Sequence, residues 1–270
     1  MGLVHRIESA QNDTVKHLLK LMSSNARMKQ AGVALAEGLH LVQGLLKYQT
    51  EYSVDSVFFP DSLEGNAEWV ELEALLMRHG SFKRFVMPIS LYKKMSKLNT
   101  PTGPLVVFQL PKVPLHPLNL QQDVVVLDDI QDPGNVGTLL RNCAAAGVRQ
   151  VVATQGCAWV WSDKALRAGM CAQFGLLFFT ESELLEALAQ HTETPVRVTS
   201  LVLQSTPVFQ TNLRAAGVWV FGSEGQGVGV SWLERANQHV RIPQTDWVDS
   251  LNVASSSAVC LFEQLRQRSH

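Results

Sequence analysis

The chain has 270 residues, of which 46% are hydrophobic and 17% are charged. This length allows one large domain or two modest ones, and the composition is that of a globular protein, which excludes a disordered chain. No run of about 18 apolar residues is present and the N-terminus lacks the apolar core of a signal peptide, so we expect a cytoplasmic protein with no membrane segment. The four cysteines form no CxxC pair and no histidine stands at zinc-finger spacing, so the sequence predicts no metal site.

The net charge of −1 hides an uneven distribution of charged residues. Residues 1–121 contain 13 basic and 10 acidic residues, whereas residues 122–270 contain 10 basic and 14 acidic ones. The stretch 74–122 has seven basic residues and no acidic residue. A field of a single sign can attract a polyanion, although an ordinary solvated surface explains the same pattern.

The first hundred residues predict a small α/β unit. The expected helices cover 12–30, 36–48 and 66–79, and the expected strands cover 54–59, 83–88 and 104–110. Prolines then cluster between residues 101 and 117, which is typical of an extended linker. We therefore predict one domain over 1–110, a proline-rich linker over 111–121 and a second domain over 122–270.

Apolar strands and helices alternate after the linker. The expected strands cover 124–130, 150–154, 176–179, 196–203, 218–222 and 239–243. The expected helices are 135–147, 163–170, a segment after a capping box at Thr180 and Glu183, a segment after a second box at Ser231 and Glu234, and 252–267. This alternation, with nearly continuous apolar strands, predicts a parallel sheet covered by helices on both faces.

Two loops fall where ligands bind in such a sheet, at the carboxyl ends of strands. In residues 128–142, Asn135 can cap a helix after a Pro-Gly turn, and we expect Arg141 to project to the same side of that helix. In residues 221–229, four glycines surround Glu224, which suits a loop that wraps a ligand but lacks P-loop and GxGxxG spacing. Each has a simpler interpretation, a capped helix with a surface arginine and a flexible turn respectively.

A third loop, residues 241–259, brings polar Ser250 and Asn252 to the start of a helix rich in small residues. Ordinary helix capping accounts for one of these two residues. The glycine-rich loop follows a late strand, whereas a Rossmann enzyme carries such a loop after its first strand. The order of the loops therefore disfavours a standard dinucleotide site.

Taken together in this order, the three loops resemble the signature motifs of the SpoU/TrmH family of RNA 2'-O-methyltransferases, within the SPOUT superfamily. The resemblance covers roughly residues 122–270, and Glu37-Gly38 is similar to the start of the RNA-binding domain in two-domain rRNA-type members. The matching motif residues are Asn135, Gly137, Arg141 and Gly147, then Gly222, Glu224, Gly225 and Gly227, then Ile242, Pro243, Ser250, Leu251, Asn252 and Val253. The departures are Gln244, Ala254, Gly169 and Cys171, which stand where the family commonly has Met, Ser, Ser and Gly.

The resemblance implies a trefoil-knotted α/β domain with a parallel sheet, preceded by a small α/β RNA-binding domain, and a homodimer with its active site near the interface. It implies S-adenosylmethionine as the cofactor. The implied cofactor contacts are Leu201, Gly222, Gly225, Ile242, Leu251 and Asn252. Because the resemblance implies RNA as the partner, it favours the interpretation of the basic stretch as a phosphate-binding surface. The candidate RNA-binding residues are Arg78, Lys83, Arg84, Lys93, Lys94 and Lys97. The last three stand at helix-like spacing.

The catalytic residues carried over from the family are Arg141, Asn135, Glu224, Ser250 and Asn252. The family's arginine is proposed to act as a general base, but a guanidinium has a pKa above about 12 and keeps its proton at neutral pH. We therefore expect Arg141 to hold an RNA phosphate and stabilise a developing alkoxide. Asn135 is expected to position Arg141 or the ribose, Glu224 to orient loop groups or the arginine, and Ser250 and Asn252 to order the cofactor loop.

The sequence thus predicts methyl transfer from S-adenosylmethionine to a ribose 2'-hydroxyl of structured RNA. Ribosomal RNA is preferred over tRNA because the smallest tRNA members are nearly the knotted domain alone. A catalytically silent RNA-binding or ribosome-assembly protein would bind cofactor without transfer. A methyltransferase acting on a base nitrogen would be distinguished by product analysis.

Overall fold

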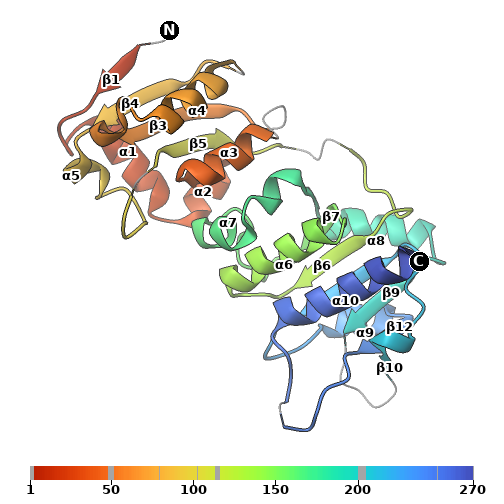
Figure 1. Cartoon of the computed structure of the whole chain (residues 1–270). Coiled ribbons are helices and arrows are strands. Elements are labelled where there is room, and N and C mark those ends of the chain that lie inside the picture. Colours follow the sequence, from red (N-terminus) through yellow and green to blue (C-terminus); the bar gives the residue numbers. More distant parts are fainter. Residues whose placement is uncertain are drawn as a thin grey trace. The chain divides into compact units, whose positions relative to one another are not determined.

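The computed structural model describes residues 3–47, 52–78, 80–101, 103–112, 116–199, 205–247 and 249–269. The chain divides into two compact units (Figure 1). The first is Met1–Val113 with Trp161–Asp163, and the second is Pro114–Val160 with Lys164–His270. None of the described helices is long and apolar enough to cross a membrane.

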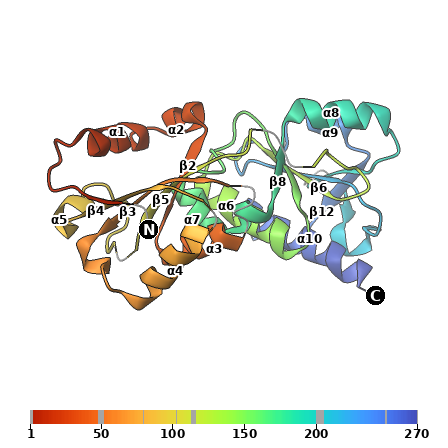
Figure 2. The same cartoon turned by 90° about the horizontal axis from the view of Figure 1, so that it is seen from above.

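The first unit is a mixed sheet with helices on both faces. Its strands are β1 (Val4–Arg6), β2 (Val33–Glu37), β3 (Val54–Pro60), β4 (Lys83–Met87) and β5 (Leu105–Gln109), in the order β1-β4-β3-β5-β2. β1, β4 and β3 run parallel, and β5 is antiparallel to both β3 and β2. Its helices are α1 (Asp13–Met22), α2 (Asn25–Ala31), α3 (Leu39–Lys47), α4 (Ala67–Arg78) and α5 (Ile89–Tyr92), with a 3-10 turn η1 (Asp61–Leu63). Figure 2 shows α1 and α2 on one face of this sheet and α3 and α4 on the other.

Two of the helices predicted for this unit are wrong in extent. The helix expected over 12–30 is divided, because the Ser24 hydroxyl caps α2 by accepting from the N–H groups of Ala26 and Arg27. The helix expected over 36–48 begins only at Leu39, because the largely buried run Val33–Glu37 is strand β2. Neither β2 nor the short exposed strand β1 is predicted from the sequence.

The second unit contains the parallel sheet that the sequence predicts. Its strands are β6 (Val124–Asp128), β7 (Gln150–Ala153), β8 (Leu177–Phe179), β9 (Val196–Thr199), β10 (Thr206–Pro207), β11 (Val218–Gly222) and β12 (Gln238–Arg241). The order is β10-β12-β9-β11-β6-β7-β8, and every pairing is parallel. All residues of the central strands β6 and β11 are buried, which accounts for their unbroken apolar sequences. The knot stays a prediction, because strand order alone does not define how the chain is threaded.

Helices cover both faces of this sheet. They are α6 (Pro133–Ala145), α7 (Asp163–Gly169), α8 (Glu181–Gln190), α9 (Val230–Arg235) and α10 (Val253–Arg268), with 3-10 turns η2 (Ala172–Gly175) and η3 (Val208–Gln210). Figure 2 shows α8 and α9 on one face and α6 and α10 on the other. Side chains of β11 alternate between the two: Val218 and Val220 join the core that contains Trp232 of α9, whereas Trp219 donates a hydrogen bond from Nε1 to Gln264 of α10.

Two predicted helix caps of the second unit are confirmed and two are wrong, and one of those confirmed is Asn252, which caps α10. Thr180 and Glu183 form the expected capping box at the start of α8. Asn135 does not cap α6; the Asp132 carboxylate does, by accepting from the Asn135 N–H at 2.9 Å, because Pro133 takes the first helical position that its ring favours. The box expected at Ser231 is absent, since α9 begins at Val230 after Gly229 and has no side-chain cap.

The described end of the predicted linker is anchored in the second unit. Leu120 packs into the core beneath α8 and α9. The Asn119 N–H donates to Gln150 Oε1 at 2.8 Å, and Gln150 Nε2 donates to the Asn119 carbonyl at 2.9 Å. Residues 118–121 are therefore fastened to β7 and to the core of the second unit and do not act as a free spacer.

Candidate functional site

The three sequence motifs meet at the carboxyl edge of the parallel sheet. β6 runs into the loop before α6, β11 into the glycine-rich loop before α9, and β12 into the loop before α10. Since β6 and β11 are neighbours, with Gly222 paired to Asp128, the first two loops leave the sheet side by side. This edge is where open α/β sheets bind their ligands.

The glycine-rich loop is folded back on itself. Ser223 and Gly227 form a short bridge, and Gly227 takes a left-handed φ of 71°. A β-carbon on Gly222 would lie 2.1 Å from the Gly227 carbonyl oxygen, so no larger residue fits there without moving the loop. The far end of the loop is held by Asp128, whose carboxylate accepts the Gly229 N–H at 2.7 Å. Asp128 is therefore a positioning residue, and no sequence motif indicates this role.

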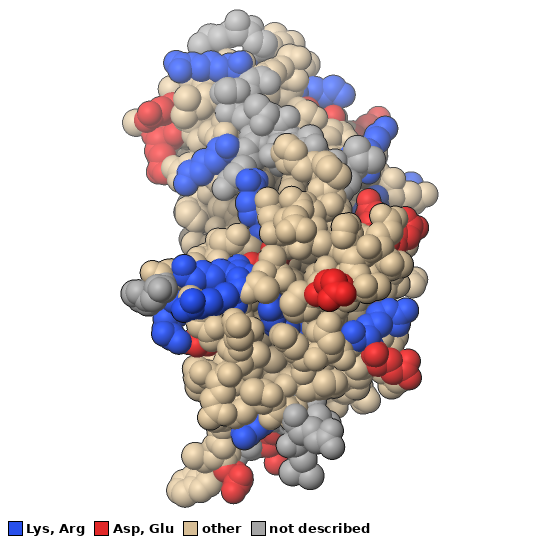
Figure 3. Space-filling view, turned by 90° about the vertical axis from the view of Figure 1, so that its right-hand side faces the viewer, with Lys and Arg blue, Asp and Glu red and all other residues tan. Residues whose placement is uncertain are grey.

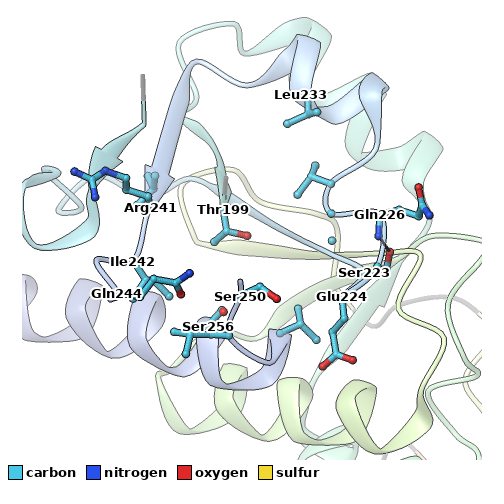
Figure 4. A pocket seen from close by; sticks show the side chains of 17 residues that line it. Thr199, Ser223, Glu224, Gln226, Leu233, Arg241, Ile242, Gln244, Ser250 and Ser256 are labelled. Carbon is cyan, nitrogen blue, oxygen red and sulfur yellow. Dashed lines mark hydrogen bonds between the residues drawn. The ribbon is translucent and has the colours of Figure 1, made fainter. Parts of the chain in front are cut away.

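A pocket of about 410 Å³ opens between this loop and the start of α10 (Figure 4). It is lined by Thr199, Gly222, Ser223, Glu224, Gly225, Gln226, Gly227, Val228, Leu233, Val240, Arg241, Ile242, Gln244, Ser250, Leu251, Val253 and Ser256. Its volume falls within the range of small-molecule sites. The lining combines loop backbone and hydroxyl groups with apolar side chains, a mixture that suits a ligand with both a polar and an apolar part.

Four of the six predicted cofactor contacts line this pocket: Gly222, Gly225, Ile242 and Leu251. Asn252 does not line it, although both of its neighbours do. The prediction for Leu201 lies outside the described residues. Thr199, Gln226 and Ser256 are lining residues that the sequence analysis missed, and the position of Thr199 at the end of a parallel strand is the signal that could have indicated it.

Three polar side chains, one from each motif, form a hydrogen-bonded cluster beside the pocket. Asn135 Nδ2 donates to Glu224 Oε1 at 3.2 Å, and Asn252 Nδ2 donates to Asn135 Oδ1 at 3.0 Å and also to Glu224 Oε1. Asn252 Oδ1 meanwhile caps α10 by accepting from the Ala254 N–H at 3.0 Å. We refer to Asn135, Glu224 and Asn252 as the polar triad. Both the oxygen and the nitrogen of the Asn252 side-chain amide are thus hydrogen-bonded within the protein, and these bonds fix the orientation of the amide.

Arg141 lies outside the polar triad. Its side chain belongs to an exposed residue of α6, and within the described part of the chain it has no hydrogen bond or ion pair. The expectation that Arg141 lies on the same side of α6 as Asn135 is wrong. The six residues from Asn135 to Arg141 span one and two-thirds helical turns, so the two side chains leave the helix in directions about 120° apart. The Asn135 amide is engaged by Glu224 and Asn252 instead.

Asn142, the residue after Arg141, fixes α6 against α10. Its Nδ2 donates to the Ala254 carbonyl at 2.7 Å and to Ser257 Oγ at 2.9 Å. The start of α6 is held separately: Asp132 caps it and pairs with Lys164 at 2.7 Å, and the Lys164 ammonium and the Asn135 N–H keep the pKa of Asp132 below its ordinary value. α6 therefore presents Arg141 from a rigid helix.

The structure changes the predicted RNA-binding surface. Arg84 is buried and pairs with Glu73 at 3.4 Å, so its inclusion as a surface phosphate contact is wrong. The helix-like spacing of Lys93, Lys94 and Lys97 does not reflect a helix, because α5 ends at Tyr92. The Lys97 N–H donates to the Glu37 carboxylate and not to a helix carbonyl.

The other basic residues of the stretch stay candidates. Arg78, Lys83, Lys93, Lys94 and Lys97 are exposed, although the Lys97 ammonium pairs with Asp163 at 3.5 Å. Figure 3 draws a different side of the molecule, the right-hand side of Figure 1, on which Lys and Arg side chains form a group of their own and Asp and Glu side chains are scattered. The candidacy of the five first-unit residues therefore rests on their exposure and on the absence of acidic residues from the stretch 74–122.

Two of the four cysteines, Cys143 and Cys260, belong to the core, and none of the four lines the pocket. Cys143 and Cys260 are buried, and burial raises the pKa of Cys143 and raises that of Cys260 to about 12. Neither thiol ionises at neutral pH, so neither is a ready nucleophile. Among the described residues, no group of three or more His, Cys, Asp and Glu side chains could hold a metal ion.

Comparison with known proteins gives a consistent result. The sequence model described as the SpoU rRNA Methylase family matches residues 122–262. An uncharacterized tRNA/rRNA methyltransferase of Synechocystis sp. is 30% identical over 267 residues, covering 97% of this chain and 94% of that protein. The 23S rRNA (guanosine(2553)-2'-O)-methyltransferase RlmP of Bacillus subtilis is 27% identical, covering 95% and 98%. The crystal structure of an AdoMet-bound rRNA methyltransferase from Sinorhizobium meliloti has the same fold, with a TM-score of 0.83 at 22% identity over 98% of each chain.

Proposed function

The chain belongs to the SpoU rRNA methylase family, and from this premise we propose that it transfers a methyl group from S-adenosylmethionine to a ribose 2'-hydroxyl of ribosomal RNA. The observation that carries the proposal is the convergence of all three motifs on one pocket and one hydrogen-bonded triad. The residues involved lie up to 117 positions apart in the sequence. A surface turn or an isolated helix cap would not require such convergence.

The pocket fits the proposed cofactor. Gly222 is confined by the Gly227 carbonyl, which leaves the loop backbone itself as the pocket wall. Ile242 and Leu251 provide apolar surface for an adenine ring, and Ser250 provides a hydroxyl for polar groups. The cofactor supplies an electrophilic methyl group on a sulfonium. The residues of this chain bind it, exclude water and orient the incoming hydroxyl.

The reaction forms a bond between the ribose O2' and the methyl carbon while the carbon–sulfur bond breaks, and the hydroxyl proton passes to solvent. Arg141 is suited to hold an RNA phosphate and to stabilise the negative charge that develops on O2'. Its guanidinium has no partner among the described side chains, so it is available for such contacts. In this account Arg141 binds and stabilises and does not remove the proton.

The polar triad holds the geometry of the site. Asn252 ties the start of α10, which lines the pocket, to Glu224 of the glycine-rich loop and to Asn135 of α6. α6 also carries Arg141, so one network links the cofactor loops to the arginine-bearing helix. We assign Asn135, Glu224 and Asn252 a positioning role, and Ser250 a role in ordering the cofactor loop.

The remaining proposals concern RNA binding, assembly and location. Arg78, Lys83, Lys93, Lys94 and Lys97 of the first unit would contact RNA phosphates, and the protein would act in the cytoplasm. The second unit would form a homodimer. Phe262 and Leu265 support this, because they are 45% and 38% exposed and lie three residues apart on α10, so they share one side of the helix. Light scattering of the wild-type protein and of Phe262→Asp tests the dimer: we expect the variant to have half the wild-type mass.

The experiment that tests the proposed reaction uses purified protein, methyl-labelled S-adenosylmethionine and total RNA from a strain that lacks the gene. The RNA is separated by size after reaction and digested to nucleosides. We expect label in ribosomal RNA, recovered as a 2'-O-methylnucleoside. Label on a base, or label in tRNA alone, would contradict the proposal, and cofactor and RNA binding without transfer would indicate a silent assembly protein.

A further inference from the structure

Trp247 is the most exposed large apolar side chain among the described residues, with 94% of its surface open to solvent. Tryptophan offers a large apolar surface, and leaving it in water forfeits the free energy that its burial would provide. Of the other five tryptophans, Trp69, Trp161, Trp219 and Trp232 are buried and Trp159 is partly buried. Trp247 is more exposed than any of the other large apolar side chains described, and a tryptophan left almost entirely in water points to a binding partner.

The position of Trp247 relates it to the cofactor pocket. It lies in the loop between β12 and α10, which projects from the body of the second unit in Figure 1. Gln244 and Ser250, three residues to either side, both line the pocket. Gln244 Nε2 also donates to the Asp249 carbonyl at 3.2 Å, which closes the loop at its base. Three extended residues span at most about 10 Å, so the Cα atom of Trp247 lies within about 10 Å of residues that line the pocket. A distance of this size is about the length of one nucleotide.

The charges beside Trp247 indicate which part of an RNA it meets. Asp246 and Asp249 are exposed on the same loop, and two carboxylates repel a phosphate. The face of a nucleobase carries no charge and stacks on an aromatic ring. The loop is thus suited to a base and unsuited to the phosphate backbone.

We propose that Trp247 stacks on an unpaired base of the RNA substrate, at or next to the nucleotide whose ribose enters the active site. The inference rests on the proposed function and deepens it, because it predicts that the substrate presents its target from a single-stranded loop, a bulge or an opened helix. Stacking of this kind recognises any base, so Trp247 contributes affinity and positioning and does not by itself determine which base is chosen.

The proposal is tested with Trp247→Ala, Trp247→Phe and the control Phe209→Ala, which removes another exposed aromatic side chain of the second unit that does not line the pocket. The substrate is unmodified 23S ribosomal RNA transcribed in vitro. We expect Trp247→Ala to raise KM for RNA about 5- to 150-fold, which corresponds to losing ~1–3 kcal/mol of base stacking. Trp247→Phe should recover most of this loss, the Kd for S-adenosylmethionine should stay unchanged, and Phe209→Ala should retain the wild-type KM.

Fluorescence separates this inference from the proposed reaction. Acrylamide should quench Trp247 in the free protein, and added RNA should protect it, a difference that is absent in Trp247→Phe. This readout requires binding and not methyl transfer, so stacking without transfer would contradict the proposed function alone. An unchanged KM with no protection would overturn the inference, and so would absence of RNA binding. If Trp247→Ala raised the Kd for S-adenosylmethionine, Trp247 would contact the cofactor and not the RNA. If acrylamide failed to quench Trp247 even in the absence of RNA, and Trp247→Ala had a lower mass than the wild type, Trp247 would lie between two copies of the chain.

Discussion

Single side chains decide how the three motif loops are joined. Asn252 caps α10 with its oxygen and uses its nitrogen to reach both Asn135 and Glu224. An amide is suited to this position because it offers an acceptor and two donors at once. Arg141 differs from the triad, because it is not held by the described side chains and faces solvent on a rigid helix.

The first prediction concerns Arg141. Arg141→Ala should lower the rate of methyl transfer about 100-fold or more, the loss typical of removing a group that stabilises developing negative charge. Arg141→Lys should lose most activity as well, because a lysine cannot present the planar fork of a guanidinium. Single-turnover transfer and calorimetric cofactor binding measure the two effects. The Kd for S-adenosylmethionine should not change, since Arg141 does not line the pocket, and near-normal transfer by the alanine variant would refute the assigned role.

The second prediction concerns the polar triad. Asn252→Asp keeps a good cap for α10 but removes the amide donors and sets two carboxylates against each other, so transfer should fall and unfolding should become easier. Adding Glu224→Gln exchanges donor and acceptor and should restore part of both losses. A double-mutant cycle on the free energy of unfolding should give a coupling of about 1 kcal/mol. If the effects of the two substitutions on the free energy of unfolding were simply additive, the hydrogen bond between residues 252 and 224 would not contribute to stability.

At the scale of elements, the site depends on how loops and helices are fastened to the sheet. The glycine-rich loop is closed by the Ser223–Gly227 bridge at one end and by Asp128 at the other. α6 and α10 are joined through Asn142, and the end of α10 is joined to the loop at 211–213 through Gln267, which donates to the Thr211 carbonyl and accepts the Leu213 N–H. These contacts fasten the glycine-rich loop, α6 and α10 to their neighbours.

The third prediction follows from the confinement of Gly222. Gly222→Ala places a β-carbon 2.1 Å from the Gly227 carbonyl oxygen, so the loop must shift. We expect a loss of about 1–3 kcal/mol in the free energy of unfolding, as for other overpacked positions, together with weaker cofactor binding. Chemical denaturation and calorimetry measure the two. Gly225→Ala is the matched control for stability, because no atom lies within 4 Å of its added β-carbon; equal stability of the two variants would contradict this account of the loop.

The fourth prediction concerns pH and α10. Hydrogen bonds from Arg266 and Gln267 lower the pKa of Glu263 to about 2. Because the pKa of an unfolded glutamate is about 4.3, this group stabilises the fold above that pH, and the contribution disappears as the pH falls through about 2. Glu263→Gln should therefore lower Tm at pH 7 and match the wild type near pH 2. A Tm difference that is the same at both pH values would show that the ionised carboxylate is not responsible.

Sequence patterns predicted these elements unevenly, for physical reasons. The buried strands β6 and β11 and the capping box at Thr180 carry strong local signals. β2 was missed because its apolar run leads directly into α3, so strand and helix patterns merge. The predicted cap at Asn135 is wrong because Pro133 favours the first helical position, which makes Asp132 the cap. The predicted exposure of Arg84 is wrong because the residue is buried and pairs with Glu73, a contact that the sequence pattern does not reveal.

At the scale of the whole molecule, the expected family and enzyme class, an RNA 2'-O-methyltransferase, are confirmed by the match over residues 122–262 and by the relatives. The predicted α/β fold with a parallel sheet is confirmed as well. The contacts of the polar triad could not be predicted, since they join residues separated by 28, 89 and 117 positions and depend on the sheet order. The site residues could be named from the resemblance to the family, whereas the hydrogen bonds between them are visible only in the structure.

The most direct test of ribose methylation uses the chemistry of RNA itself. Alkali cleaves RNA through attack by a free 2'-hydroxyl, so a 2'-O-methyl group protects the phosphodiester bond that follows it. Ribosomal RNA from a strain lacking the gene is compared with RNA from the same strain expressing the wild-type chain or Arg141→Ala. We predict one alkali-resistant position that is present with the wild-type chain and absent with no gene and with Arg141→Ala. The same cleavage pattern in all three samples would contradict the central claim that this chain methylates a ribose of ribosomal RNA.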